Sequence, residues 1–158
     1  MIKKVPGDGS CFYHSVLVGL RDKPLSSSLK SKINVQYLRK LVAKKIEVMY
    51  NNDVDKSFVD FYINDTSNSL EKYINATLKN MWAGPLEAYA LSKSLKIRIQ
   101  VYNFSDLKKY QDYYKSLKDP IIDFGDKRKK PVKVVIYGFD FTDRNTGFHY
   151  DALIILPS

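Results

Sequence analysis

Two segments late in the chain, residues 132–139 and 148–156, are rich in β-branched and aromatic residues. Such nearly continuous apolar strands are typical of the centre of a sheet, where both faces are covered. The segments that cover them must come from earlier in the chain, where the apolar residues recur with helical spacing. Helices first and strands late predict an α+β or α/β domain with a central β-sheet packed between helices.

The expected helices are marked by apolar residues three or four positions apart and by residues suited to helix starts. They begin after the turn at residues 6–10, at residue 35, after Ser69 and at Pro85, and they end near residues 20, 50, 78 and 95. Residues 97–102 alternate as in a strand. Residues 26–31 are expected to be a polar connection, and residues 103–131 an exposed insertion. With no repeats or linkers, residues 1–158 are expected to form a single domain.

Composition narrows the function classes. The net charge is +9, but lysine far outnumbers arginine and is spread along the chain, whereas base and phosphate recognition favours arginine. We therefore expect no nucleic acid partner, although a basic nucleic-acid-binding domain stays an alternative that steeply salt-dependent binding would support. No apolar run approaches the roughly 20 residues of a membrane span. A cytoplasmic monomer with no membrane partner, no cofactor and no metal is expected, because one cysteine and two histidines supply few metal ligands.

The single cysteine has the setting of a nucleophile. Cys11 follows a glycine-containing turn and opens the first expected helix. Unpaired backbone N–H groups and the helix dipole favour a thiolate there, and the same N–H groups can hold an oxyanion. A cysteine in a protein of this kind is more often a small buried hydrophobe, so this setting alone leaves the question open.

A base and its orienting acceptor are expected at the other end of the chain. His149 and Asp151 lie two positions apart in a predicted strand, so their side chains share one face. They can supply the imidazole that activates Cys11 and the carboxylate that fixes its tautomer. His14, three residues after Cys11, is a competing base, although a helix directs its side chain along the helix.

Three motifs resemble those of the ovarian-tumour (OTU) cysteine proteases. Residues 7–15 (GDGSCFYHS) are similar to the nucleophile motif, and residues 147–153 (GFHYDAL) to the C-terminal His-Tyr-Asp motif. Between them, residues 82–92 (WAGPLEAYALS) resemble the Trp-Gly-Gly-x-x-Glu segment of the family. Tyr13 and His14 stand where family members often carry Phe-Arg, and Ala83 replaces a glycine.

The resemblance implies a papain-like deubiquitinase, in a compact form like those of viruses or bacteria. Cys11, His149 and Asp151 would form the catalytic triad, and Asp8 would be a fourth catalytic residue. The oxyanion hole would be formed by the backbone of Asp8, Gly9, Ser10 and Cys11. Phe148, Tyr150 and Trp82 would line the substrate channel. The partner would be ubiquitin, polyubiquitin chains or a ubiquitin-like modifier.

Other readings remain open. The same fold can act as a catalytically weak ubiquitin-binding module, and the same residues can serve a cysteine-dependent acyltransferase. The abundance of Lys, Asn, Ile and Tyr is typical of an AT-rich genome, such as that of a large DNA virus or an intracellular bacterium. In that case the substrates would be ubiquitin conjugates in the host cell cytosol.

Overall fold

The computed structural model describes residues 2–66, 69–103, 119–137 and 149–154. In this part of the chain six helices accompany a five-stranded mixed sheet, which confirms the α+β class. The helices are α1 (Cys11–Leu20), α2 (Ser27–Lys32), α3 (Val35–Tyr50), α4 (Lys56–Thr66), α5 (Leu70–Lys79) and α6 (Pro85–Leu95). The strands are β1 (Ile2–Lys3), β2 (Ile99–Asn103), β3 (Ile122–Phe124), β4 (Val132–Tyr137) and β5 (His149–Leu153).

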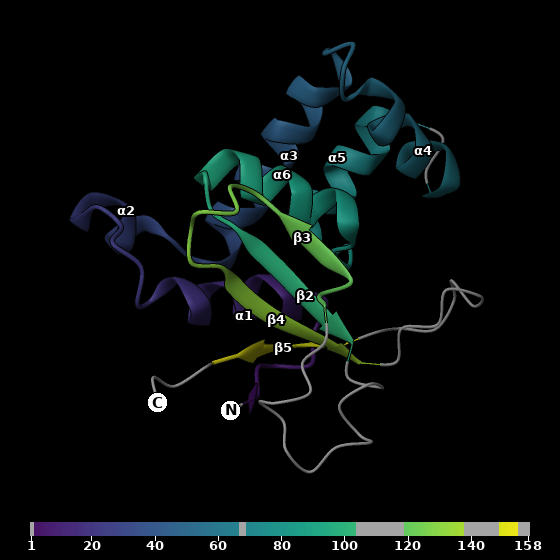
Figure 1. The fold of residues 1–158 in the computed structure, drawn as a ribbon. Helices are drawn as coiled ribbons and strands as arrows, with labels where there is room; N and C mark the ends of the chain where they lie inside the picture. The colour runs from purple at the N-terminus through teal and green to yellow at the C-terminus, as the bar shows by residue number, and fades with distance from the viewer. Residues whose placement is uncertain (1, 67–68, 104–118, 138–148, 155–158) are drawn as a thin grey trace.

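The sheet has the strand order β1-β5-β4-β2-β3, with β2 and β4 parallel and the other pairs antiparallel. The two apolar late strands, β4 and β5, therefore take interior positions, as their composition predicts. The two-residue strand β1 pairs with the end of β5, Ile2 opposite Leu153. The first and last described residues thus meet at one edge of the sheet, where the two ends of the ribbon lie close together in Figure 1.

Helix α1 lies against β4 and β5, and α3 packs against both α5 and α6 (Figure 1). The core joins these helices to one face of the strands, through residues such as Phe12, Val42, Leu91 and Val134. A smaller apolar cluster of Tyr102, Val135 and Leu153 lies on alternate strand positions, with Ile2 packed against it. No described helix is both long and apolar enough to cross a membrane.

The four expected helices are present with nearly the expected bounds. Ser69 caps α5, because its side chain accepts a hydrogen bond from the N–H of Lys72. The expected polar connection at 26–31 was wrong, because α2 forms there with Ser26 as its N-cap. Helix α4 and strand β1 were not predicted. Strand β3 lies in what was expected to be an exposed insertion, while residues 104–118 of that insertion and the turn at 140–146 lie outside the described residues.

Candidate functional site

Cys11 is the first residue of α1, directly after a tight turn. The N–H of Cys11 donates to the carbonyl of Asp8 at 3.2 Å, which closes the turn onto the helix. The residue is 2% exposed, and its Sγ accepts the backbone N–H of Tyr150 at 3.4 Å. This contact joins the start of α1 to the second residue of β5, 139 positions away in the chain.

The thiol lies in a different electrostatic setting from the one that its position on the helix predicts. Burial raises the pKa of Cys11, and the negative charge of Asp8 adds to this, while the Tyr150 N–H acts in the opposite direction. The net effect is a raised pKa, because desolvation of the sulfur outweighs the backbone donors. The resting group is therefore a neutral thiol that needs a base, rather than a thiolate formed by the helix alone.

His149 and Asp151 lie on one face of β5, as the period of a strand requires. The Nε2 atom of His149 lies 2.9 Å from Oδ1 of Asp151, which fixes the ring from that side. The other ring nitrogen, Nδ1, lies on the side of Gly7, where a Cβ would stand 3.9 Å from it. The His149 side chain is 30% exposed, so a substrate can reach it.

Asp151 is held by two residues that the sequence motifs did not indicate. Its Oδ1 accepts the N–H of Val5 at 2.9 Å, and its Oδ2 pairs with Nζ of Lys4 at 2.8 Å. Burial alone would raise the pKa of this fully buried carboxyl, but Lys4, the Val5 N–H and His149 together lower it. Asp151 therefore stays a carboxylate, the form that can accept a hydrogen bond from a protonated Nε2.

Asp8 organises the turn ahead of Cys11. Its Oδ1 accepts the N–H of Ser10 at 2.9 Å, and its Oδ2 lies 3.4 Å from Nε2 of His14. The ring of His14 is thus directed back to the turn, which disfavours it as the base for Cys11. Among the expected oxyanion donors, Ser10 and Cys11 already donate within the turn, whereas the N–H groups of Asp8 and Gly9 have no hydrogen-bond partner in the described residues.

The residues expected to line a substrate channel differ in their exposure. Tyr150 is 3% exposed and its ring packs edge-on against Phe12, with its hydroxyl donating to the carbonyl of Ala83 at 3.1 Å. The main-chain N–H of Tyr150 is the group that donates to Sγ of Cys11. Trp82, next to Ala83, is 42% exposed. Phe148 lies outside the described residues.

Arg39 of α3 also reaches the turn and was not predicted as a site residue. Its guanidinium donates to the carbonyl of Gly9 and to Oγ of Ser10, each at 2.9 Å. A signal was present in the sequence, since Arg39 lies three and seven positions before the buried Val42 and Ile46. This spacing puts a charged residue on the apolar face of the helix.

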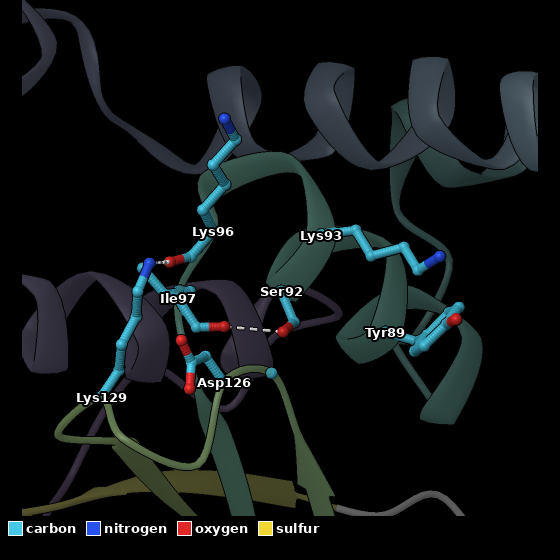
Figure 2. A pocket seen from close by; sticks show the side chains of 8 residues that line it. Tyr89, Ser92, Lys93, Lys96, Ile97, Asp126 and Lys129 are labelled. Carbon is cyan, nitrogen blue, oxygen red and sulfur yellow. Dashed lines mark hydrogen bonds between the residues drawn. The ribbon is translucent and has the colours of Figure 1, made fainter.

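A separate pocket lies between the end of α6 and the turn that leads from β3 to β4 (Figure 2). Two of its three ammonium groups bind other groups of the protein, because Lys93 pairs with Asp55 and Lys129 donates to the carbonyl of Lys96. Figure 2 shows the Lys96 side chain pointing away from the Lys129 end of the pocket. The pocket contains neither a cysteine nor a histidine, so it offers no nucleophile–base pair. Its lining residues are Tyr89, Ser92, Lys93, Lys96, Ile97, Gly125, Asp126 and Lys129.

Comparison with solved structures identifies the fold. The viral OTU domain protease of Dera Ghazi Khan virus superposes with a TM-score of 0.61 at 19% identity, over 99% of this chain and 81% of that chain. The Hazara virus OTU bound to ubiquitin gives 0.59 at 20% identity, over 100% and 82%. An OTU deubiquitinase from Wolbachia pipientis wMel gives 0.58 at 16% identity, over 98% and 87%.

Sequence comparison points the same way. Over 102 residues, 64% of this chain, the sequence is 29% identical to the RNA-directed RNA polymerase L of Crimean-Congo hemorrhagic fever virus (strain Nigeria/IbAr10200/1970), and it covers 2% of the length of that protein. The model of the OTU-like cysteine protease family matches residues 6–123, which is more than half of the chain and includes Cys11 but ends before β4 and β5. The chain therefore belongs to the OTU-like cysteine protease family.

Proposed function

We propose that this protein is a deubiquitinase, which hydrolyses the isopeptide bond after the C-terminal glycine of ubiquitin or of a ubiquitin-like modifier. The observation that supports the proposal is that Cys11 contacts the strand that carries His149 and Asp151. The sulfur of Cys11 contacts the main chain of β5, and His149 on the same strand is oriented by the buried Asp151. The choice of substrate is supported by the Hazara virus OTU and by a further OTU domain, both solved in complex with ubiquitin.

In the proposed reaction Nδ1 of His149 takes the proton of the Cys11 thiol as the sulfur attacks the isopeptide carbonyl. The negative oxygen of the tetrahedral intermediate is stabilised by backbone N–H groups of the turn at residues 8–11. His149 then gives its proton to the leaving lysine amine, and a thioester remains on Cys11. Water, deprotonated by His149, attacks the thioester, releases the modifier with a C-terminal carboxylate and restores the thiol.

Asp151 has an orienting role in this scheme. It keeps the proton-bearing Nε2 of His149 turned inward, and it stabilises the imidazolium that forms while the proton is on the ring. Asp8 acts through the turn, because its carboxylate fixes the N–H of Ser10. The proposed channel residues are Phe148, Tyr150 and Trp82, of which Trp82 is exposed and Tyr150 is buried.

We also propose that residues 1–158 act as one catalytic domain. Strand β1 is the support for this view, because it pairs with β5 and is followed at once by Lys4 and Val5, which hold Asp151. The start of the chain is therefore part of the same unit as the C-terminal motif.

The proposed reaction is tested by cleavage of lysine-linked diubiquitin in water enriched in ¹⁸O, followed by mass spectrometry of the released ubiquitin. Hydrolysis adds one ¹⁸O to the C-terminal carboxylate, whereas an acyltransferase joins ubiquitin to an amine and adds none. Cys11→Ala and His149→Ala are expected to abolish cleavage, and Asp151→Ala to lower turnover but leave measurable activity. Tight binding of ubiquitin without cleavage by the wild-type protein would indicate a binding module instead.

A further inference from the structure

Arg39 is a charged side chain in the middle of α3 that is 1% exposed. Its five N–H groups are all used. Nε donates to Oγ of Ser10 at 3.3 Å, Nη1 to the carbonyls of Thr77 and Met81 at 2.9 and 3.0 Å, and Nη2 to the carbonyl of Gly9 and to Oγ of Ser10. The guanidinium also stacks on the Tyr13 ring, 4.6 Å from its centroid. One side chain thus joins α3, the end of α5 and the turn before Cys11.

These contacts fix the peptide unit between Gly9 and Ser10 from both ends. Arg39 binds its carbonyl oxygen, and the carboxylate of Asp8 binds its N–H. The C=O and N–H of a trans peptide point in opposite directions, so holding both prevents rotation of the plane. The turn is also pressed against the end of α5, because a Cβ at Gly9 would stand 2.5 Å from the carbonyl oxygen of Asn80.

Two local costs indicate that this arrangement has a purpose other than filling space. A buried guanidinium is expensive to desolvate, and within the described residues no carboxylate forms an ion pair with Arg39. Ser10 is the N-cap residue of α1, yet its side chain makes no capping hydrogen bond and serves Arg39 instead. Both departures meet at the turn that carries the nucleophile.

We propose that Arg39 is a positioning residue for acyl transfer at Cys11. It holds the turn at residues 8–11 in the conformation in which its free N–H groups, those of Asp8 and Gly9, stabilise the oxyanion. This inference rests on the proposed function for its substrate. It goes beyond that function because it concerns the contacts that keep the turn at residues 8–11 rigid. Lysine in place of Arg39 keeps the charge but has three donors rather than five, and it cannot hold all the acceptors at once.

The test compares two reactions of the same sulfur, followed by mass spectrometry of intact protein. In acylation by p-nitrophenyl acetate, Sγ attacks the carbonyl, an oxyanion forms and p-nitrophenolate leaves. In alkylation by iodoacetamide, Sγ displaces iodide and no oxyanion forms. Arg39→Lys is expected to slow acylation by about 10- to 100-fold and to leave alkylation within about twofold. Ser10→Ala, which keeps the guanidinium anchored at Thr77 and Met81, is expected to show the same selective loss with smaller amplitude.

Tyr73→Phe is the matched control. It removes the hydroxyl that donates a buried hydrogen bond to Glu87, so it lowers stability. It removes none of the acceptors of Arg39, so the contacts of the guanidinium with Gly9 and Ser10 stay in place. It is expected to leave both reactions unchanged at 25 °C. The proposal is overturned if acylation and alkylation fall together in Arg39→Lys and in Ser10→Ala, or if acylation is unaffected. Neither reagent contains ubiquitin, so a failure of the wild-type protein to cleave diubiquitin would refute the proposed function separately.

Discussion

Nζ of Lys4, an exposed residue, lies 2.8 Å from Oδ2 of the fully buried Asp151. The pair links the strand at the start of the chain to the carboxylate that orients His149. Of the two oxygens of Asp151, one serves His149 and Val5, and the other is neutralised by Lys4. The acidic member of the proposed triad is therefore supported by residues outside the three sequence motifs.

Lys4→Met is expected to lower the melting temperature at pH 7 by about 2–4 °C, as for a loss of roughly 1 kcal/mol. The pKa of Asp151 is lower in the folded protein than in the unfolded chain, so its ionised carboxylate stabilises the fold. This stabilisation is fully present above the ordinary carboxyl pKa of about 4. It is lost as the pH falls through the pKa that Asp151 has in the folded protein. The difference between variant and wild type should shrink in strongly acidic solution. Melting curves from pH 7 to pH 3 measure it.

Lys3→Met is the control for this prediction, because Lys3 is an exposed neighbour on β1 with no ion pair among the described residues. It should change the melting temperature little at any pH. Equal effects of Lys3→Met and Lys4→Met, or an effect of Lys4→Met that persists unchanged at pH 3, would contradict the role given to Lys4.

Tyr13→Phe is expected to leave stability unchanged or to raise it by up to about 1 kcal/mol. The Tyr13 hydroxyl is buried and has no hydrogen-bond partner in the described part of the chain, so its removal relieves an unsatisfied polar group. Tyr73→Phe should instead lower the free energy of unfolding by about 1–3 kcal/mol, because the buried Glu87 loses the hydrogen bond that it accepts from the Tyr73 hydroxyl. Urea unfolding of both variants measures the contrast, and equal losses would refute it.

The rate at which iodoacetamide alkylates Cys11 is expected to rise with pH, with a midpoint above the ordinary thiol value of about 8.5. Burial raises the pKa of the folded thiol, so the thiolate forms less readily than in the unfolded chain. The free energy of unfolding is therefore expected to fall as the pH rises above about 8.5, because the thiol ionises at a lower pH in the unfolded chain than in the folded protein. The control is the same residue in concentrated urea, and a lower midpoint in the folded protein than in urea would contradict this account.

Much of the fold and site follows from local sequence. The helices at 35–50 and 85–95 were predicted with their bounds because their apolar residues repeat regularly and Pro85 marks a start. The strand period placed His149 and Asp151 on one face, and their hydrogen bond follows from it.

Apart from helices α2 and α4, the parts that sequence did not predict depend on contacts between distant segments. Strand β1 has two residues and exists only because β5 offers an edge. Lys4 lies 147 positions before Asp151, and Arg39 lies 28 positions after Cys11. The raised pKa of Cys11 likewise reflects the depth at which β5 and α1 bury the sulfur, which the helix position alone cannot indicate.

The most direct test of the proposed function is mass spectrometry of the protein after reaction with ubiquitin that carries an alkyne at its C-terminus. A single covalent adduct is expected on the wild-type protein, at Cys11, and none on Cys11→Ala or His149→Ala. An adduct that persists in Cys11→Ala would contradict the assignment of the nucleophile. The absence of any adduct with ubiquitin and with ubiquitin-like modifiers carrying the same group would contradict the proposed function itself.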